Sequence, residues 1–93
     1  MFIVVYRWRI HPGREEEFRA AWEELSSQYI QLRGQLDAKL TQGEDDVWVG
    51  KAIWGDRDDY ILALERGVTD PQVANRMNAS VAEKLDPEFR YID

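Results

Sequence analysis

The first hydrophobic run of the chain, FIVVYRWRI at residues 2–10, is rich in β-branched and aromatic residues and stops at the His-Pro-Gly sequence of residues 11–13. This composition and this ending predict a strand followed by a turn. Gly34 ends a second segment, which we expect to be a helix because glycine is common just past a helix C-terminus. Within that segment, apolar residues recur at the three- and four-residue steps of one helix face: Phe18, Trp22, Leu25, Tyr29 and Leu32.

Two strands joined by a hairpin are predicted next. Residues 35–41 alternate polar and apolar side chains, as a half-buried strand does, and residues 47–54 form the apolar run VWVGKAIW. The intervening sequence QGEDD at residues 42–46 is typical of a turn.

The remaining pattern predicts two helices and a last strand. Asp56 is placed to cap a helix that Gly67 closes. The sequence Thr-Asp-Pro at residues 69–71 is a strong start for a third helix, which we expect to continue to about Lys84. PEFRYI at residues 87–92 reads as a short strand at an edge of the sheet, where a proline is tolerated at its start.

This βαββααβ order is that of a ferredoxin-like α+β fold, in which helices cover one face of an antiparallel sheet. We expect one domain over residues 1–93. Both faces of the first and third strands carry apolar residues, and an uncovered apolar face on a monomer usually marks an interaction surface. We therefore predict a homodimer packed sheet to sheet. Arg7, Arg9 and Lys51 fall on that outer face, where we expect them to lie at a rim or to pair with acidic side chains.

Composition narrows the classes of partner. Asp and Glu number 18 against 12 Lys and Arg, giving a formal net charge of −6, which argues against binding to nucleic acid or to anionic membranes. The absence of cysteine excludes disulfides, thiolate metal sites and a catalytic thiol. The N-terminal apolar run is interrupted by arginines and is too short for a signal segment or a membrane span. We therefore expect a cytoplasmic protein.

Aromatic residues supply the candidate site. Tyr6, Trp8 and Trp54 point from the strands toward the predicted helices, where rings with polar tips can form a pocket wall or an ordinary core. From the third helix, Arg76 or Asn78 could add a positive charge or an amide. Two small residues on the face of Trp54, Gly50 and Ala52, are compatible with room for a ligand and also with close approach of a helix.

Acidic runs and the single histidine have simpler interpretations. Asp56, Asp58 and Asp59 fit a helix start better than a metal site, and residues 44–46 fit a hairpin turn. His11 could act as a general base, but its place beside a Pro-Gly turn is typical of an exposed residue.

Four pieces of the chain resemble the antibiotic-biosynthesis monooxygenase superfamily of dimeric α+β barrels. They are HPGREEEF after the first strand, the tryptophan in RAAW, the glycine start RGQL of the second strand, and VWVGKAIWGDRDDYILAL. The resemblance implies a small dimer that binds a hydrophobic, often polycyclic or quinone-like molecule between sheet and helices. It also implies that some members oxygenate such molecules without a metal or organic cofactor.

The same resemblance bears on individual residues. A haem-degrading branch of the superfamily uses an asparagine on the first strand, a tryptophan on the third and a haem-ligating histidine on the last helix. Trp54 corresponds to that tryptophan and Tyr6 stands at the asparagine position, whereas residues 75–77 are Asn, Arg and Met, with no histidine. We therefore expect no haem and no other cofactor.

The resemblance leaves the reaction open. A cofactor-independent monooxygenase acting on an aromatic or quinone-like substrate is the first hypothesis. Such an enzyme needs hydrogen-bond donors and a base, and the sequence shows no evident base. A non-catalytic ligand-binding or regulatory module, and an isomerase or cyclase of the same fold, remain alternatives.

Overall fold

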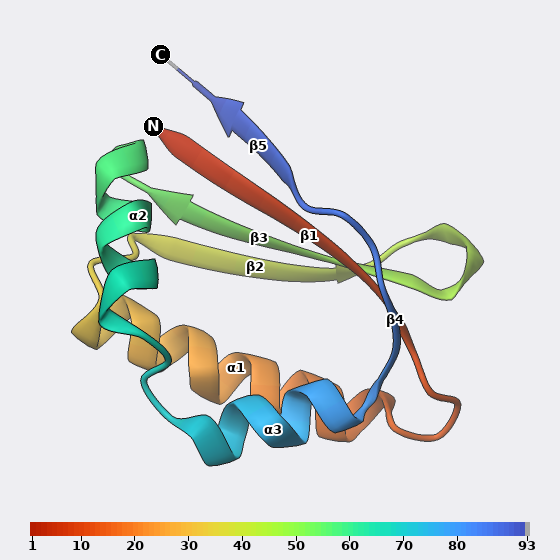
Figure 1. Cartoon of the computed structure of the whole chain (residues 1–93). Coiled ribbons are helices and arrows are strands. Elements are labelled where there is room, and N and C mark those ends of the chain that lie inside the picture. The colour runs from red at the N-terminus through yellow and green to blue at the C-terminus, as the bar shows by residue number, and fades with distance from the viewer. Residues whose placement is uncertain (93) are drawn as a thin grey trace.

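The computed structural model describes residues 1–92, which form one antiparallel sheet with helices on one of its faces (Figure 1). Asp93, the last residue of the predicted domain, lies outside the described residues. The elements are β1 (Phe2–Ile10), α1 (Glu15–Leu32), β2 (Asp37–Gln42), a 3₁₀ turn (Glu44–Asp46), β3 (Val47–Trp54), α2 (Arg57–Arg66), α3 (Pro71–Ala79), β4 (Val81–Lys84) and β5 (Glu88–Tyr91).

The sheet has the strand order β2-β3-β1-β4, and β5 pairs with β1 farther along the same strand. This arrangement confirms the predicted ferredoxin-like α+β fold. The register of β1 against β3 places Phe2 opposite Trp54, Tyr6 opposite Gly50 and Trp8 opposite Trp48. Directly opposed residues share one face of a sheet, so these side chains all point toward the helices.

The predicted third helix was wrong over its last residues. Helix α3 ends at Ala79, and Val81–Lys84 form strand β4, which pairs with β1 through Val81 opposite Ile10 and Lys84 opposite Trp8. The reason lies in the sheet: β1 has a second edge whose backbone groups need partners, and the β-branched Val81 suits a strand. This pairing outweighs the helical preference of the Ala-Glu-Lys sequence.

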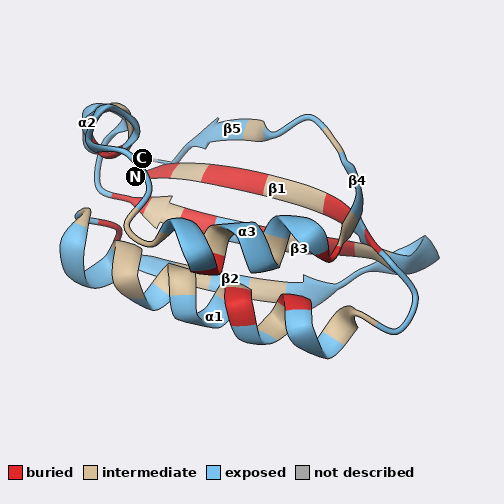
Figure 2. Cartoon of the chain, turned by 60° about the horizontal axis from the view of Figure 1, so that its bottom comes forward, coloured by how far each residue is buried: buried red, intermediate tan, exposed pale blue. Residues whose placement is uncertain are grey.

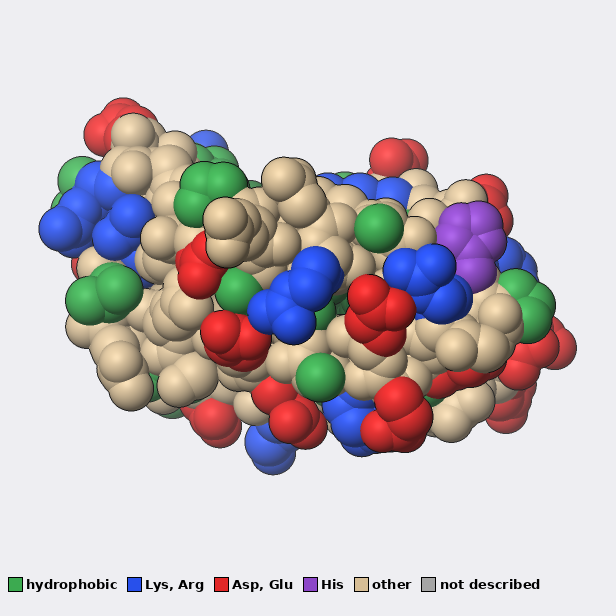
Figure 3. Space-filling view, turned by 90° about the horizontal axis from the view of Figure 1, so that it is seen from below, with side chains coloured by type: hydrophobic (Ala, Val, Ile, Leu, Met, Phe, Trp, Pro, Cys, Tyr) green, Lys and Arg blue, Asp and Glu red, His purple; other side chains and the backbone are tan. Residues whose placement is uncertain are grey.

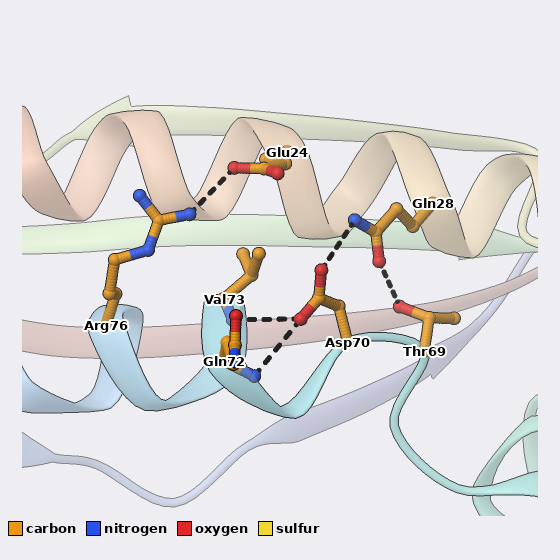
Figure 4. Close-up of polar contacts among 7 residues, drawn as sticks. All are labelled: Glu24, Gln28, Thr69, Asp70, Gln72, Val73 and Arg76. Carbon is orange, nitrogen blue, oxygen red and sulfur yellow. Dashed lines mark hydrogen bonds and ion pairs between the residues drawn. The ribbon is translucent and has the colours of Figure 1, made fainter.

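Helices α1 and α3 lie side by side beneath the sheet, and α2 stands at its end, across the direction of the other two (Figure 1). Asp70 caps α3, because its side chain accepts hydrogen bonds from the backbone N–H groups of Gln72 (3.1 Å) and Val73 (3.3 Å). Gln28 of α1 reaches the same corner and donates to Asp70 (3.4 Å) (Figure 4). Asp56 occupies the N-cap position of α2, but its side chain makes no capping hydrogen bond there, contrary to the sequence-based expectation.

Two hydrophobic clusters rest on the helix-facing side of the sheet, where β1 and β3 are most buried (Figure 2). One contains Phe2, Val4, Ala52, Trp54 and Ala63. The other contains Trp8, Ile10, Phe18 and Trp48. Tyr6 packs against both clusters, so it marks the boundary between them.

None of the helices of residues 1–92 covers the outer face of the sheet (Figure 1). Arg7 pairs there with Glu88 (3.3 Å) and Arg9 with Glu83 (3.1 Å), so two of the three basic residues expected on this face are matched by acids. Ile3, Val49 and Ile53 of the same face are partly exposed. This face is therefore a mixture of ion pairs and incompletely covered apolar residues.

The opposite surface, formed by α1 and α3, carries charges of both signs side by side (Figure 3). Arg76 of α3 pairs with Glu24 of α1 (2.9 Å), and Arg14 pairs with Glu17 within the first turn of α1 (2.8 Å). Mixed charge of this kind is typical of a solvated surface. None of the helices formed by residues 1–92 combines the length and the apolar character that crossing a bilayer requires.

Candidate functional site

A cavity of about 260 Å³ lies between the sheet and the three helices, where the two hydrophobic clusters meet. Six aromatic residues contribute to its wall: Tyr6, Trp8, Trp22, Tyr29, Trp54 and Tyr60. Space is left because four alanines line it from four different elements: Ala38, Ala52, Ala63 and Ala74. This volume of about 260 Å³ lies just below the usual range for small-molecule pockets, which starts at about 300 Å³, so the cavity suits a compact ligand.

Four of the five candidate site residues lie in the cavity wall. Tyr6, Trp8 and Trp54 come from the sheet and Asn78 from α3. Arg76 does not reach the cavity, because the residues of α3 that face it are Ala74, Met77 and Asn78. These positions follow the three- and four-residue spacing of one helix face. Arg76 falls on the neighbouring face and forms its ion pair with Glu24 of α1 on the surface (Figure 4).

Trp54 lines the cavity and carries a polar group that has no partner in the described part of the chain. Its indole Nε1 is buried and has no hydrogen-bond partner within residues 1–92. The ring packs edge-on against Tyr60, with ring centroids 5.8 Å apart. A buried donor without an acceptor typically costs about 1–3 kcal/mol, and an acceptor atom of a bound molecule would remove that cost.

Two tyrosines of the cavity, Tyr6 and Tyr29, are held in their neutral form. Burial raises the pKa of Tyr6 far above its usual range, and the neighbouring Tyr60 adds to the effect. Burial also raises the pKa of Tyr29, partly opposed by the Arg33 guanidinium. Both phenols therefore keep their protons at neutral pH, which makes them hydrogen-bond donors rather than bases.

Gly50 and Ala52 turn out to have different roles. A Cβ on Gly50 would lie 2.7 Å from Cζ3 of Trp8 and 3.1 Å from Nε1 of Trp22, so Gly50 accommodates these two indoles. The close approach is made by aromatic rings and not by helix backbone. Ala52 instead lines the cavity, so the room expected beside Trp54 lies at Ala52 alone.

The charged groups of the wall are lysines. Lys51 and Lys84 line the cavity, and no aspartate or glutamate of residues 1–92 does so. His11 lies outside the cavity and is exposed. Within the described part of the chain, no three side chains of His, Cys, Asp or Glu gather as metal ligands would. The arrangement can therefore surround an aromatic molecule and donate hydrogen bonds to it, but it offers neither a carboxylate nor an imidazole as a base.

The residues present do not fit haem. The resemblance places the ligating histidine of the haem-degrading branch near residues 75–77, which are Asn, Arg and Met in this chain. Arg76 is also engaged with Glu24 on the surface. A histidine or cysteine is the commonest protein ligand that holds haem iron, and the cavity wall contains neither among residues 1–92.

Sequence reasoning missed several residues of the wall. Trp22 and Tyr29 belong to the apolar face of α1 and were expected only as core, while Tyr60 of α2 was not singled out. The tyrosines at core positions could have indicated the pocket from the sequence, because the hydroxyl of a buried tyrosine usually needs a hydrogen-bond partner. Lys84 could not be found, since the predicted helix placed it on the wrong element.

Comparison with known proteins gives a consistent assignment. The model of the family described as antibiotic biosynthesis monooxygenase matches residues 1–66. A search of curated proteins finds none that matches this chain.

Solved structures share the fold over nearly the whole chain. A Bordetella bronchiseptica protein that carries the same family description is 14% identical, with a TM-score of 0.82 over 99% of this chain and 96% of that chain. SnoaB from Streptomyces nogalater, a cofactor-independent oxygenase, is 20% identical, with a TM-score of 0.76 over 99% and 92%. A conserved protein from Methanosarcina mazei is 13% identical, with a TM-score of 0.78 over 96% and 89%. At these identities, the similarities show a common fold alone.

Proposed function

Because this chain belongs to the antibiotic biosynthesis monooxygenase family, we propose that it is a cofactor-independent monooxygenase that acts on a small hydrophobic aromatic or quinone-like molecule. The substrate binds in the cavity between sheet and helices. The protein acts in the cytoplasm as a homodimer, without a metal or organic cofactor, and has neither nucleic acid nor membrane as a partner. The description of SnoaB as a cofactor-independent oxygenase supports the choice of reaction.

The unpartnered indole N–H of Trp54 is the observation that carries this proposal. It is a buried donor on a residue that lines the cavity, and six aromatic residues contribute to the same wall. A carbonyl or phenolate oxygen of a ring system is the acceptor that suits such a place, because its flat body packs against aromatic side chains while its oxygen accepts the hydrogen bond. Tyr6 supplies a second neutral donor in the same wall.

The chemistry of this proposal uses the acidity of the substrate. A phenol or an anthrone-like ketone loses a proton, and donors that stabilise the resulting oxyanion make that loss easier. The electron-rich anion passes an electron to O₂, and the radical pair combines to a peroxide. Loss of water from the peroxide converts a CH₂ group to a carbonyl, so the balance is R₂CH₂ + O₂ → R₂CO + H₂O. No separate reductant is required.

No carboxylate or imidazole of residues 1–92 lines the wall, and this limits how weakly acidic the substrate can be. The proton must pass to water at the cavity mouth, because Tyr6 and Tyr29 hold their own protons. Suitable substrates are therefore those that ionise readily near neutral pH once the anion is stabilised. The same lack of a base favours a second candidate function, a non-catalytic module that binds such molecules.

The homodimer has support from the outer face of the sheet. In the described part of the chain the helices leave this face uncovered (Figure 1), and Ile3, Val49 and Ile53 are only partly buried on it. A second copy packed on these residues would complete their burial. Arg7 and Arg9 are already paired with Glu88 and Glu83, so they would not enter that contact as unpaired charges.

Turnover with and without oxygen tests the proposed reaction. Purified protein is mixed with a panel of quinols and anthrones under air, under argon and under ¹⁸O₂, and products are followed by mass spectrometry. A monooxygenase incorporates one ¹⁸O atom into the product and gives none under argon. Equal turnover under argon would identify an isomerase or cyclase, and binding without turnover would identify the non-catalytic module.

A further inference from the structure

The charge of the cavity wall is opposite in sign to that of the whole chain. The protein carries a formal net charge of −6, with 18 acidic residues against 12 Lys and Arg. Within residues 1–92, no aspartate or glutamate lines the wall, and of its two lysines the strand register directs only the side chain of Lys84 toward the cavity. A wall without acids in so acidic a protein favours a ligand that is itself negatively charged.

Lys84 is the lysine whose side chain belongs to the cavity side of the sheet. It pairs across the strands with Trp8, and directly opposed residues of an antiparallel pair share a face. The neighbouring Glu83 points to the other face, where it pairs with Arg9. Lys51 pairs with Val5 and Lys39 in register, which places it on the outer face.

Lys84 is also free to bind a ligand. It is exposed and makes no ion pair within residues 1–92, and neither does Asp86 in the segment between β4 and β5. The acids of the two strands themselves are engaged. Glu83 holds Arg9, and Glu88 holds both Arg7 and Arg90. An ammonium group at the mouth of an aromatic cavity therefore has no competing partner in either strand.

We infer that Lys84 determines specificity by pairing with an anionic group, such as a carboxylate, on the aromatic ligand. This inference rests on the proposed function, because it concerns the same cavity. Trp54 stands opposite Phe2 and Lys84 opposite Trp8, six residues apart along β1, which is about 20 Å of strand. The anionic group of the ligand therefore belongs at the Lys84 end of the cavity, beside Trp8.

Two probes of the same shape separate charge from packing. They are 6-hydroxy-2-naphthoate and its neutral amide, 6-hydroxy-2-naphthamide, which share a bicyclic ring and a hydroxyl at the end away from the variable group. Isothermal titration calorimetry gives the Kd of each for the wild type and for Lys84→Ala, Lys84→Arg and Lys84→Glu. Arg66→Ala is the matched control, because it removes a positive charge from the end of α2, outside the cavity wall.

The expected result is a preference of the wild type for the carboxylate of about two- to fivefold at low salt, in keeping with a solvent-exposed ion pair. This preference disappears in Lys84→Ala, survives in Lys84→Arg and Arg66→Ala, and reverses in Lys84→Glu. It also shrinks as salt is added. Equal affinities in the wild type, or a preference that survives Lys84→Ala, would overturn the role of Lys84 and leave the proposed function standing. Failure of both probes to bind the wild type would overturn the proposed function together with this inference.

Discussion

The indole of Trp8 lies so close over Gly50 that a Cβ built on this glycine would be 2.7 Å from Cζ3 of the ring. We expect Gly50→Ala to displace Trp8 and to lower the free energy of unfolding by about 1–3 kcal/mol, as overpacking of a core does. Urea denaturation followed by circular dichroism measures the change.

Gly55→Ala is the control for this substitution. Its Cβ would meet the end of the Asp59 side chain at 3.2 Å, which can move away. The loss of stability caused by Gly50→Ala should also be smaller when Trp8 has first been replaced by leucine, because the indole ring that the new Cβ would clash with is then absent. Equal losses at the two glycines would contradict the role given to Trp8.

Replacing Trp54 by phenylalanine tests the unpartnered donor. The ring remains aromatic, but the Nε1–H is lost, so affinity for a quinone-like ligand should fall by about two- to tenfold, the worth of one neutral hydrogen bond. Trp48→Phe is the matched control, since Trp48 is also buried but lies outside the cavity wall. Calorimetric titration with a naphthoquinone compares the two variants. Similar affinity in both would remove Trp54 as a ligand donor.

Replacing the N-cap aspartate by alanine should lower the free energy of unfolding by different amounts at α3 and at α2. Asp70→Ala should lower the free energy of unfolding by about 1–2 kcal/mol, because Asp70 accepts from two backbone N–H groups of α3 and from Gln28. Asp56→Ala should cost much less, since the side chain of Asp56 makes no capping hydrogen bond. Thermal and urea unfolding distinguish the two, and an equal loss would show that Asp56 caps α2 in solution.

Alkaline pH should destabilise the fold through Tyr6. Burial raises the pKa of Tyr6 in the folded state, while in the unfolded chain a tyrosine has a pKa near 10. Above about pH 10 the unfolded state therefore releases a proton that the folded state keeps, and the free energy of unfolding falls by up to about 1.4 kcal/mol per pH unit.

Tyr6→Phe should flatten this alkaline slope in urea denaturation between about pH 9.5 and 11.5. Tyr29→Phe should flatten it less, because the Arg33 guanidinium opposes the effect of burial on the pKa of Tyr29. An unchanged slope in Tyr6→Phe would show that this phenol is not protected from ionisation.

The outer face of the sheet predicts the oligomeric state. Light scattering coupled to size-exclusion chromatography should give twice the 10.9 kDa mass of one chain. Ile53→Lys should shift this mass toward the monomer, because it puts a charge on the partly exposed outer face. Leu62→Lys changes an exposed residue of α2 and should leave the mass unaltered. A concentration-independent monomer in the wild type would refute the dimer.

Most of the fold could be predicted because the apolar residues recur along the sequence at the spacings typical of strands and helices. The strand at residues 2–10 and the hairpin strand at residues 47–54 have the predicted bounds, since β-branched runs ended by turn residues are strong local signals. The segment Val81–Lys84 could not be predicted in this way. Its strand conformation depends on the free edge of β1, which is far away in the sequence.

The candidate site was predictable in its sheet residues and less so in its helix residues. Strand alternation places Tyr6, Trp8 and Trp54 on one face without further information. On α3, the rotation of the helix decides whether Arg76 or Asn78 faces inward. The buried Val73 and the core-packed Met77 mark the inward face, which leaves Arg76 on the surface with Glu24. The unpartnered state of the Trp54 N–H has no local signal in the sequence, because it depends on every group surrounding the indole.

The four alanines of the cavity wall make its shape easy to alter in evolution. Each comes from a different element: Ala38 from β2, Ala52 from β3, Ala63 from α2 and Ala74 from α3. A larger side chain at any one of them would reduce the cavity from a different side. The shape of the ligand could therefore change one side at a time, with the six aromatic residues of the wall retained.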